Sequence, residues 1–179
     1  DGHKMIGVGG SDSHNLIDER YEGATLPSIA GDPGTYVFCD KLMPAHLIEN
    51  VKKGHVCVTR FIQVEPHIMA GEKEYLPGDE LGEVNKITYH ALIRDAEEKP
   101  VVYLIKNGIK TKLSVEQKLD GTYEIQECIA LERGKWQWIR LEIRTQAGEL
   151  LGYVNPVYQG EKEPEYTTFG EIADRMDQG

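Results

Sequence analysis

The chain has 179 residues, with 20 lysines and arginines against 30 aspartates and glutamates, and a formal net charge of -10. This length is enough to bury a hydrophobic core in one large or two small domains. The acidic balance argues against nucleic acid and anionic membrane surfaces as partners, because both are bound through clustered lysine and arginine.

The first third of the chain predicts an α/β arrangement. A short apolar strand stops at a pair of glycines, and a loop rich in Gly, Pro, Asp and Ser follows it. A loop of that length is usually functional or mobile. The elements that we expect here are a strand at 5–8, the loop at 11–34, a strand at 35–39, a helix at 43–54 and a strand at 55–64.

From about residue 80, short β-branched and aromatic runs recur at nearly regular spacing, which predicts an antiparallel β-sandwich. Asn107-Gly108 predicts a two-residue hairpin that pairs Lys106 with Ile109. The other expected strands are "ITYHALI" (87–93), "TYEIQECIAL" (122–131), "WQWIRLEIRT" (136–145) and "ELLGYV" (149–154).

The alternation in "WQWIRLEIR" places Ile139, Leu141 and Ile143 on one face of a strand. Trp136 and Trp138 fall on the opposite face. Either a bulge near residue 138 shifts the alternation of inward and outward side chains, or the tryptophans lie on the outer face of the sheet. We favour outer-face packing against a neighbouring domain or partner.

The acidic tail, 161–179, contains a predicted amphipathic helix at 169–177. Thr168 and Glu171 have the spacing of a capping box at its start.

The three cysteines, Cys39, Cys57 and Cys128, lie far apart in apolar stretches and form no CxxC motif. We therefore expect neither a disulfide framework nor a structural zinc site, and we expect a reducing, cytoplasmic location. We expect no membrane span and no signal peptide. The chain begins with "DGHK", without an initiator Met, so we expect it to be a piece of a longer protein.

The stretch "GVGGSDSH" (7–14) is the main candidate for chemistry. In an extended segment, residues two apart point the same way, so Asp12 and His14 could approach one metal or two adjacent ones. A carboxylate oxygen and an imidazole nitrogen suit zinc, manganese or iron. Ordinary turn chemistry also explains Gly-Ser-Asp-Ser, and on spacing alone it is the better explanation.

The other histidines do not complete a ligand set by spacing. His3 precedes the strand and has only its position in favour of a third-ligand role. The remaining four are typical of surface or satisfied core histidines: His46, His55, His67 and His90.

The order of "VGGSDSH", a Gly/Pro-containing loop, "GDPGTYVFCD" and a helix ending in "KKGHVCVTR" resembles the end of a PHP (polymerase and histidinol phosphatase) domain. The later motifs "LPGDEL", "IKNG", "WIRLEIR" and "YVNPVY" are similar to the tail of the CehA/McbA-like branch of these metallohydrolases. The resemblance implies an α+β fold: residues 1–65 would be the C-terminal segment of a (β/α)7-type barrel, and residues 66–160 an antiparallel β-sandwich.

The resemblance also implies a metal-dependent phosphoesterase that acts on a small phosphoester. Asp12 and His14 match the family's final metal ligands, and Ser11 and Ser13 would orient them. The divalent metals, Zn, Mn or Fe, would activate a water molecule. The family's other ligands precede this motif, so we expect the chain alone to be inactive, and no catalytic side chain is assigned in it.

Two further expectations follow. If the PHP-like segment is only a scaffold, the sandwich is a binding module for a protein or a carbohydrate. Its candidate contacts are Trp136, Trp138, Tyr103 and Tyr153, although aromatic side chains more often fill a core. In addition, the exposed strands of a partial barrel predict self-association through residues 5–8 or 35–39, or a disordered loop at 11–34.

Overall fold

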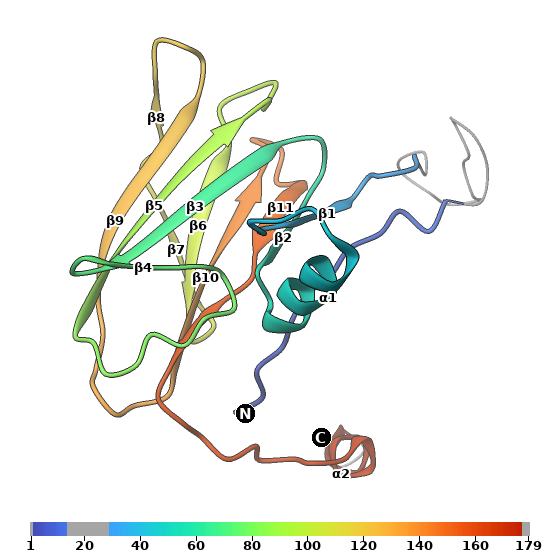
Figure 1. Ribbon diagram of the computed structural model, residues 1–179, viewed down its shortest axis with the longest axis vertical. Helices are drawn as coiled ribbons and strands as arrows, with labels where there is room; N and C mark the ends of the chain where they lie inside the picture. The colour runs from blue at the N-terminus through green and yellow to red at the C-terminus, as the bar shows by residue number, and fades with distance from the viewer. Residues whose placement is uncertain (1, 14–28, 177–179) are drawn as a thin grey trace.

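The structure is a computed structural model that describes residues 2–13 and 29–176, and it consists mainly of two antiparallel β-sheets (Figure 1). The first sheet has the strand order β1-β2-β11-β10-β6-β7, with β12 paired to β10; the second has the order β4-β3-β5-β9-β8. The strands of the first sheet are β1 (Gly34–Val37), β2 (Val56–Thr59), β6 (Val101–Lys106), β7 (Ile109–Lys112), β10 (Gln137–Arg144), β11 (Leu150–Val154) and β12 (Val157–Gln159). Those of the second are β3 (Gln63–Ala70), β4 (Lys73–Tyr75), β5 (Lys86–Arg94), β8 (Glu116–Gln117) and β9 (Tyr123–Ala130).

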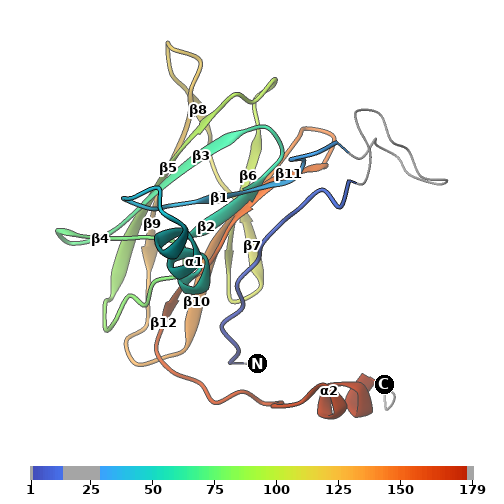
Figure 2. The same cartoon turned by 45° about the vertical axis from the view of Figure 1, so that its right-hand side comes forward.

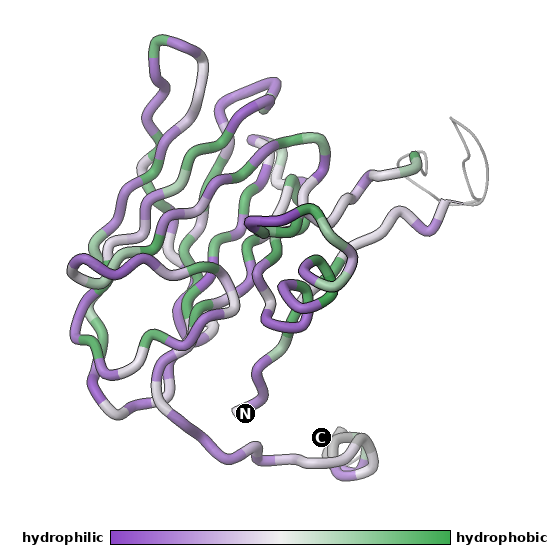
Figure 3. The backbone as a smooth tube through the Cα atoms, in the orientation of Figure 1, coloured by the Kyte–Doolittle hydropathy of each residue, from purple (hydrophilic) through white to green (hydrophobic). Residues whose placement is uncertain are grey.

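The hydrophobic core lies between the two sheets. Hydrophobic and hydrophilic residues alternate along the central strands (Figure 3), because successive side chains of a strand point to opposite faces. The inward-facing side chains of β10 and β5 include Ile139, Leu141, Ile143, Tyr89 and Ile93, all fully buried.

The first sheet has a polar outer face. Pairing of β10 with β6 continues without interruption from Ile139 to Arg144, so no bulge near residue 138 shifts the phase. Trp138 therefore lies on the outer face of β10 with Arg140, Glu142 and Arg144, and its packing against a neighbouring domain or partner stays a prediction. Trp136 precedes the strand and stacks on Tyr158, with ring centroids 5.6 Å apart.

The expected fragment of a (β/α)7 barrel is wrong. Strand β1, helix α1 (Pro44–Lys53) and strand β2 follow one another, but β1 and β2 pair antiparallel, with Gly34 opposite Thr59. A βα barrel is built from parallel strands joined by right-handed crossovers. In this chain β2 also pairs antiparallel with β11, so the segment 34–59 extends the first sheet of the sandwich. The boundary placed at residue 65 falls inside β3.

The single strand expected at 55–64 is also wrong, since β2 and β3 belong to different sheets. Phe61 adopts a φ of 57°, which is incompatible with a continuous strand, and the hydroxyl of Thr59 donates a hydrogen bond to the carbonyl of Ile62 at 2.7 Å. The chain therefore turns at residues 60–62 and crosses from one sheet to the other.

Other local predictions are confirmed. The hairpin at Asn107-Gly108 pairs Lys106 with Ile109, and both turn residues have positive φ. Helix α1 has Pro44 in its first turn and ends at Gly54 in the left-handed conformation.

Helix α2 (Phe169–Met176) begins with the expected capping box: the N–H of Thr168 donates to Glu171, and the N–H of Glu171 donates to the Thr168 hydroxyl. The helix lies away from both sheets (Figures 1 and 2). No helix in the described part of the chain is long and apolar enough to cross a membrane.

Candidate functional site

The N-terminal segment 5–10 lies against the first sheet, although it belongs to neither sheet (Figure 2). The N–H of Gly7 donates to Oδ1 of Asn155 at 2.9 Å, and Nδ2 of Asn155 donates to the carbonyl of Gly7 at 3.1 Å. The expected strand at 5–8 is wrong, because residues 5–8 pair with no strand, and the side-chain amide of Asn155 makes the pair of hydrogen bonds to Gly7.

Two hydroxyl groups complete this attachment. The hydroxyl of Thr35 accepts the N–H of Gly9 and is also placed to donate to the Gly9 carbonyl, both at 2.8 Å. The hydroxyl of Tyr158 donates to the carbonyl of Met5 at 2.9 Å. We call these three side chains, Asn155, Thr35 and Tyr158, the segment clamp.

Two glycines allow the segment to approach the sheet closely. A Cβ atom on Gly7 would lie 2.2 Å from the hydroxyl of Tyr153, and a Cβ atom on Gly9 would lie 2.3 Å from Cγ1 of Val58. Both distances are far below van der Waals contact, so packing requires Gly7 and Gly9, whereas a Cβ atom on Gly10 would meet nothing within 4 Å. This packing role is separate from the turn and ligand roles that the motif suggests.

The predicted metal ligands are only partly described. Asp12 is exposed and has a φ of 51°, so its backbone is left-handed, and the expectation of an extended segment is wrong at this residue. The N–H of Ser13 donates to the Ser11 hydroxyl at 3.3 Å, which is a local turn contact. His14 lies outside the described residues, so the pairing of Asp12 with His14 stays a prediction.

Within residues 2–13 and 29–176, no three His, Cys, Asp or Glu side chains are grouped so that they could hold a metal ion. The histidines of this part of the chain contact other groups. His3 contacts the carbonyl of Tyr166 at 2.6 Å. Buried His55 lies between Oδ1 of Asn50 and Oδ1 of Asp79, at 2.8 and 2.9 Å.

On the second sheet, the rings of His67 and His90 stack 5.7 Å apart, and each histidine is hydrogen-bonded to a glutamate, Glu74 and Glu124 respectively. His46 lies 3.6 Å from Asp40. These contacts fit the surface or satisfied core role expected of the four later histidines.

A second candidate site is a groove of about 480 Å³ on the outer face of the first sheet. Trp138 and Arg140 of β10 and Tyr153 of β11 line one side of it, and Met5 and Gly7 of the clamped segment line another. We call this the outer-face groove. A volume of this size falls in the range of small-molecule sites.

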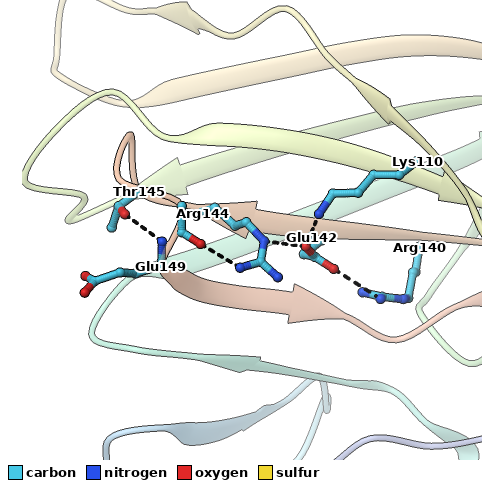
Figure 4. Close-up of polar contacts among 7 residues, drawn as sticks. Lys110, Arg140, Glu142, Arg144, Thr145 and Glu149 are labelled. Carbon is cyan, nitrogen blue, oxygen red and sulfur yellow. Dashed lines mark hydrogen bonds and ion pairs between the residues drawn. The ribbon is translucent and has the colours of Figure 1, made fainter. Parts of the chain in front are cut away.

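The buried carboxylate of Glu142 is part of the groove lining. Figure 4 shows its contacts with three cationic side chains. Oε1 of Glu142 accepts hydrogen bonds from Nζ of Lys110 at 2.5 Å and from Nε of Arg144 at 2.6 Å. Oε2 accepts a longer contact, 3.3 Å, from Nη2 of Arg140. We call these four residues, Glu142, Lys110, Arg140 and Arg144, the Glu142 cluster.

The Glu142 cluster keeps its carboxylate ionised. Burial acts to raise the pKa of Glu142, but hydrogen bonds from Lys110 and Arg144, together with their positive charges, outweigh burial and lower the pKa to about 2. Three cations surround one anion, so the cluster carries a surplus of two positive charges.

The sequence interpretation missed two features of these sites. "YVNPVY" predicts a turn, and nothing in it indicates that the Asn155 side chain binds a backbone 148 residues away in sequence. The Glu142 cluster did leave a signal: Arg140, Glu142 and Arg144 alternate with apolar residues, which places three charges side by side on one face. Of the four expected aromatic contacts, the groove includes Trp138 and Tyr153.

Comparison of the chain with protein-family models gives no match, and comparison with curated proteins gives no significant match.

Proposed function

We propose that this chain supplies two metal ligands, Asp12 and His14, to a metal-dependent phosphoesterase. The motif "GGSDSH" suggests the ligands, and one structural observation supports their placement. The segment clamp holds the backbone of Met5, Gly7 and Gly9, the last of which is the first residue of the motif, through five hydrogen bonds. A ligand that follows a fixed backbone loses less conformational entropy when it binds a metal.

The chemistry requires further ligands. A catalytic metal ion takes at least three protein ligands and keeps a position for water, so Asp12 and His14 are not sufficient. In the family that the motif resembles, the remaining ligands precede the Asp-x-His pair, and the proposal places them in polypeptide before residue 1. Bound divalent metals would lower the pKa of a water molecule and stabilise the charge that develops on the phosphoryl group.

The experiment measures metal content and phosphatase activity of the full-length gene product. We expect bound divalent metal by mass spectrometry of the digested protein, and hydrolysis of p-nitrophenyl phosphate in the presence of Mn²⁺ or Zn²⁺. Asp12→Asn and His14→Ala should each reduce the activity by at least about a hundredfold, because each removes a ligand. Asp40→Asn, an exposed carboxylate elsewhere, is the matched control.

The proposal fails if the full-length protein binds no divalent metal. It also fails if Asp12→Asn and His14→Ala retain the metal content and activity of the Asp40→Asn control.

The outer-face groove favours a second candidate function, that of a binding module. Trp138 and Tyr153 are only partly buried there, and half-buried aromatic side chains are frequent ligand anchors. This candidate does not involve Asp12, so the two functions can be tested separately.

A further inference from the structure

The outer-face groove combines an arginine with two aromatic side chains. Trp138 and Arg140 are two residues apart on β10, so their side chains emerge on the same face of the sheet. The guanidinium carbon of Arg140 lies 6.0 Å from the centre of the Tyr153 ring, a cation–π distance that orients the guanidinium. A positive group therefore lies within cation–π distance of one aromatic ring and shares a strand face and the groove lining with a second.

Arg140 is the least satisfied cation of the Glu142 cluster. Oε1 of Glu142 is occupied by Lys110 and Arg144 at short distances, whereas Arg140 makes a single contact at 3.3 Å with Oε2. Arg144 also donates to the carbonyl of Gly148 at 2.7 Å. A guanidinium has five N–H donors, and within the described part of the chain the contact with Glu142 is the only hydrogen bond that the Arg140 side chain donates.

The charge of the Glu142 cluster is opposite in sign to that of the whole chain. The cluster carries two surplus positive charges, while the chain has a formal net charge of -10. The side chain of Arg140 is 26% exposed, so the guanidinium is accessible from the groove and partly shielded from water. Partial shielding strengthens its attraction for an anion relative to a fully exposed arginine.

From these observations we infer that the outer-face groove binds a small organic anion in which a planar ring carries a carboxylate or a phosphate. Arg140 donates two hydrogen bonds to the oxyanion, and the ring packs against Trp138 and Tyr153. A neutral sugar or a peptide without an acidic group would leave Arg140 unused. The inference rests on the binding-module candidate and is independent of the proposed metal site.

The experiment is isothermal titration calorimetry of the full chain in EDTA, which removes any contribution from metal chemistry. The probes are phenyl phosphate, benzoate, inorganic phosphate and benzyl alcohol. We expect saturable 1:1 binding of phenyl phosphate or benzoate, with the tighter of the two identifying the anionic group. Inorganic phosphate and benzyl alcohol should each bind at least about tenfold more weakly, since each lacks one half of the ligand.

Three variants assign the binding to the groove. Arg140→Ala should weaken binding by about tenfold or more, and Arg140→Lys by a smaller factor, because lysine keeps the charge but lacks the two-pronged geometry. Arg133→Ala removes one positive charge from an exposed turn and should change the affinity by less than about twofold. Since Arg140→Lys conserves charge and most of the packing, it carries the test if Arg140→Ala does not fold.

Equal binding of benzyl alcohol and benzoate would overturn the anion assignment while leaving the groove a binding site. An equal loss of affinity in Arg140→Ala and Arg133→Ala would also overturn the anion assignment, because the loss would then come from the change in net charge and not from the groove. The absence of saturable binding by either anionic ring probe up to about 10 mM would overturn both the inference and the binding-module candidate. None of these outcomes affects the metal proposal.

Discussion

At the scale of single residues, Cys57 and Cys128 are both free thiols on β-strands, but they differ completely in access to solvent. Cys57 on β2 is 1% exposed and belongs to the core, whereas Cys128 on β9 is exposed. Burial raises the pKa of the Cys57 thiol to about 12, because the thiolate is poorly solvated in the core. The reactive form of Cys57 is therefore almost absent at neutral pH.

Thiol labelling tests this difference. In the folded protein we expect Ellman's reagent to modify Cys128 rapidly and Cys57 only after the addition of denaturant. Cys39 is a third, partly exposed thiol, so the comparison is made in a Cys39→Ser background, in which Cys128→Ser should remove the rapid reaction. Modification of Cys57 at the rate of Cys128 without denaturant would contradict its burial.

Another residue with an unusual environment is Tyr89, which is fully buried on β5. Its hydroxyl has no hydrogen-bond partner among the residues described, and burial raises its pKa. The alternation of "ITYHALI" puts this ring on the same strand face as Ile87, Ala91 and Ile93, which are also buried. It does not indicate whether the hydroxyl finds a partner, because partners come from other elements.

At the scale of elements, local sequence signals predicted most of the strands, and they predicted the boundaries of both helices to within a few residues. Alternation placed β5, β9 and β10, and the Asn-Gly pair fixed the register of β6 and β7. Each of these signals lies within one short stretch of sequence. The sheet to which a strand belongs is not determined by one short stretch, because it depends on contacts with distant strands. The expected strand at 55–64 was wrong for this reason: it spans β2 and β3, which pair with different neighbours.

The barrel expectation failed for a related reason. A strand–helix–strand order is compatible with parallel or antiparallel pairing of the two strands, and the sequence of β1, α1 and β2 does not distinguish them. The decisive contacts are between β2 and β11, about 95 residues apart along the chain. Strand β1 is the edge of this sheet, and self-association through it stays a prediction.

The segment clamp makes a prediction at this scale. Asn155→Ala removes both side-chain hydrogen bonds to Gly7, so it should reduce the free energy of unfolding by about 1–3 kcal/mol, measured by urea denaturation. Asn155→Asp loses the donor and places a buried carboxylate against the carbonyls of Gly7 and Gly54, so it should be at least as destabilising as Asn155→Ala.

Asn85→Ala, at an exposed position, is the control and should change the free energy of unfolding by less than about 0.5 kcal/mol. Faster amide exchange of Gly7 in Asn155→Ala, with no change in the core strands, would locate the effect at the segment. An Asn155→Ala variant as stable as the Asn85→Ala control would show that the clamp does not hold the segment.

At the scale of the whole molecule, the Glu142 cluster connects β10 with β7 and makes the stability of the sandwich depend on pH. The pKa of Glu142 is about 2 in the folded protein, below its ordinary value of 4.5. A carboxyl group whose pKa is lowered by folding stabilises the folded state above its unfolded pKa. That stabilisation is lost as the pH falls through the folded pKa.

Acid titration of stability tests this dependence. Above pH 5 the ionised Glu142 should contribute about 3 kcal/mol to the free energy of unfolding, and this contribution should disappear between about pH 4.5 and pH 2. Glu142→Gln should therefore be less stable than the wild type near neutral pH, and the difference should narrow in acid. Glu72→Gln, at an exposed position, is the control. A difference between Glu142→Gln and wild type that is independent of pH would contradict the lowered pKa.

The placement of the Glu142 cluster also gives the molecule an electric field whose sign depends on distance. Beyond a Debye length, about 8 Å at physiological salt, mobile ions screen the cluster and the acidic side chains alike, and the weak field that remains has the sign of the net charge of -10. Closer than that, the two surplus charges dominate and the field becomes attractive. A small anion can lie entirely within this region, whereas a long polyanion always extends beyond it, so the field itself selects by size.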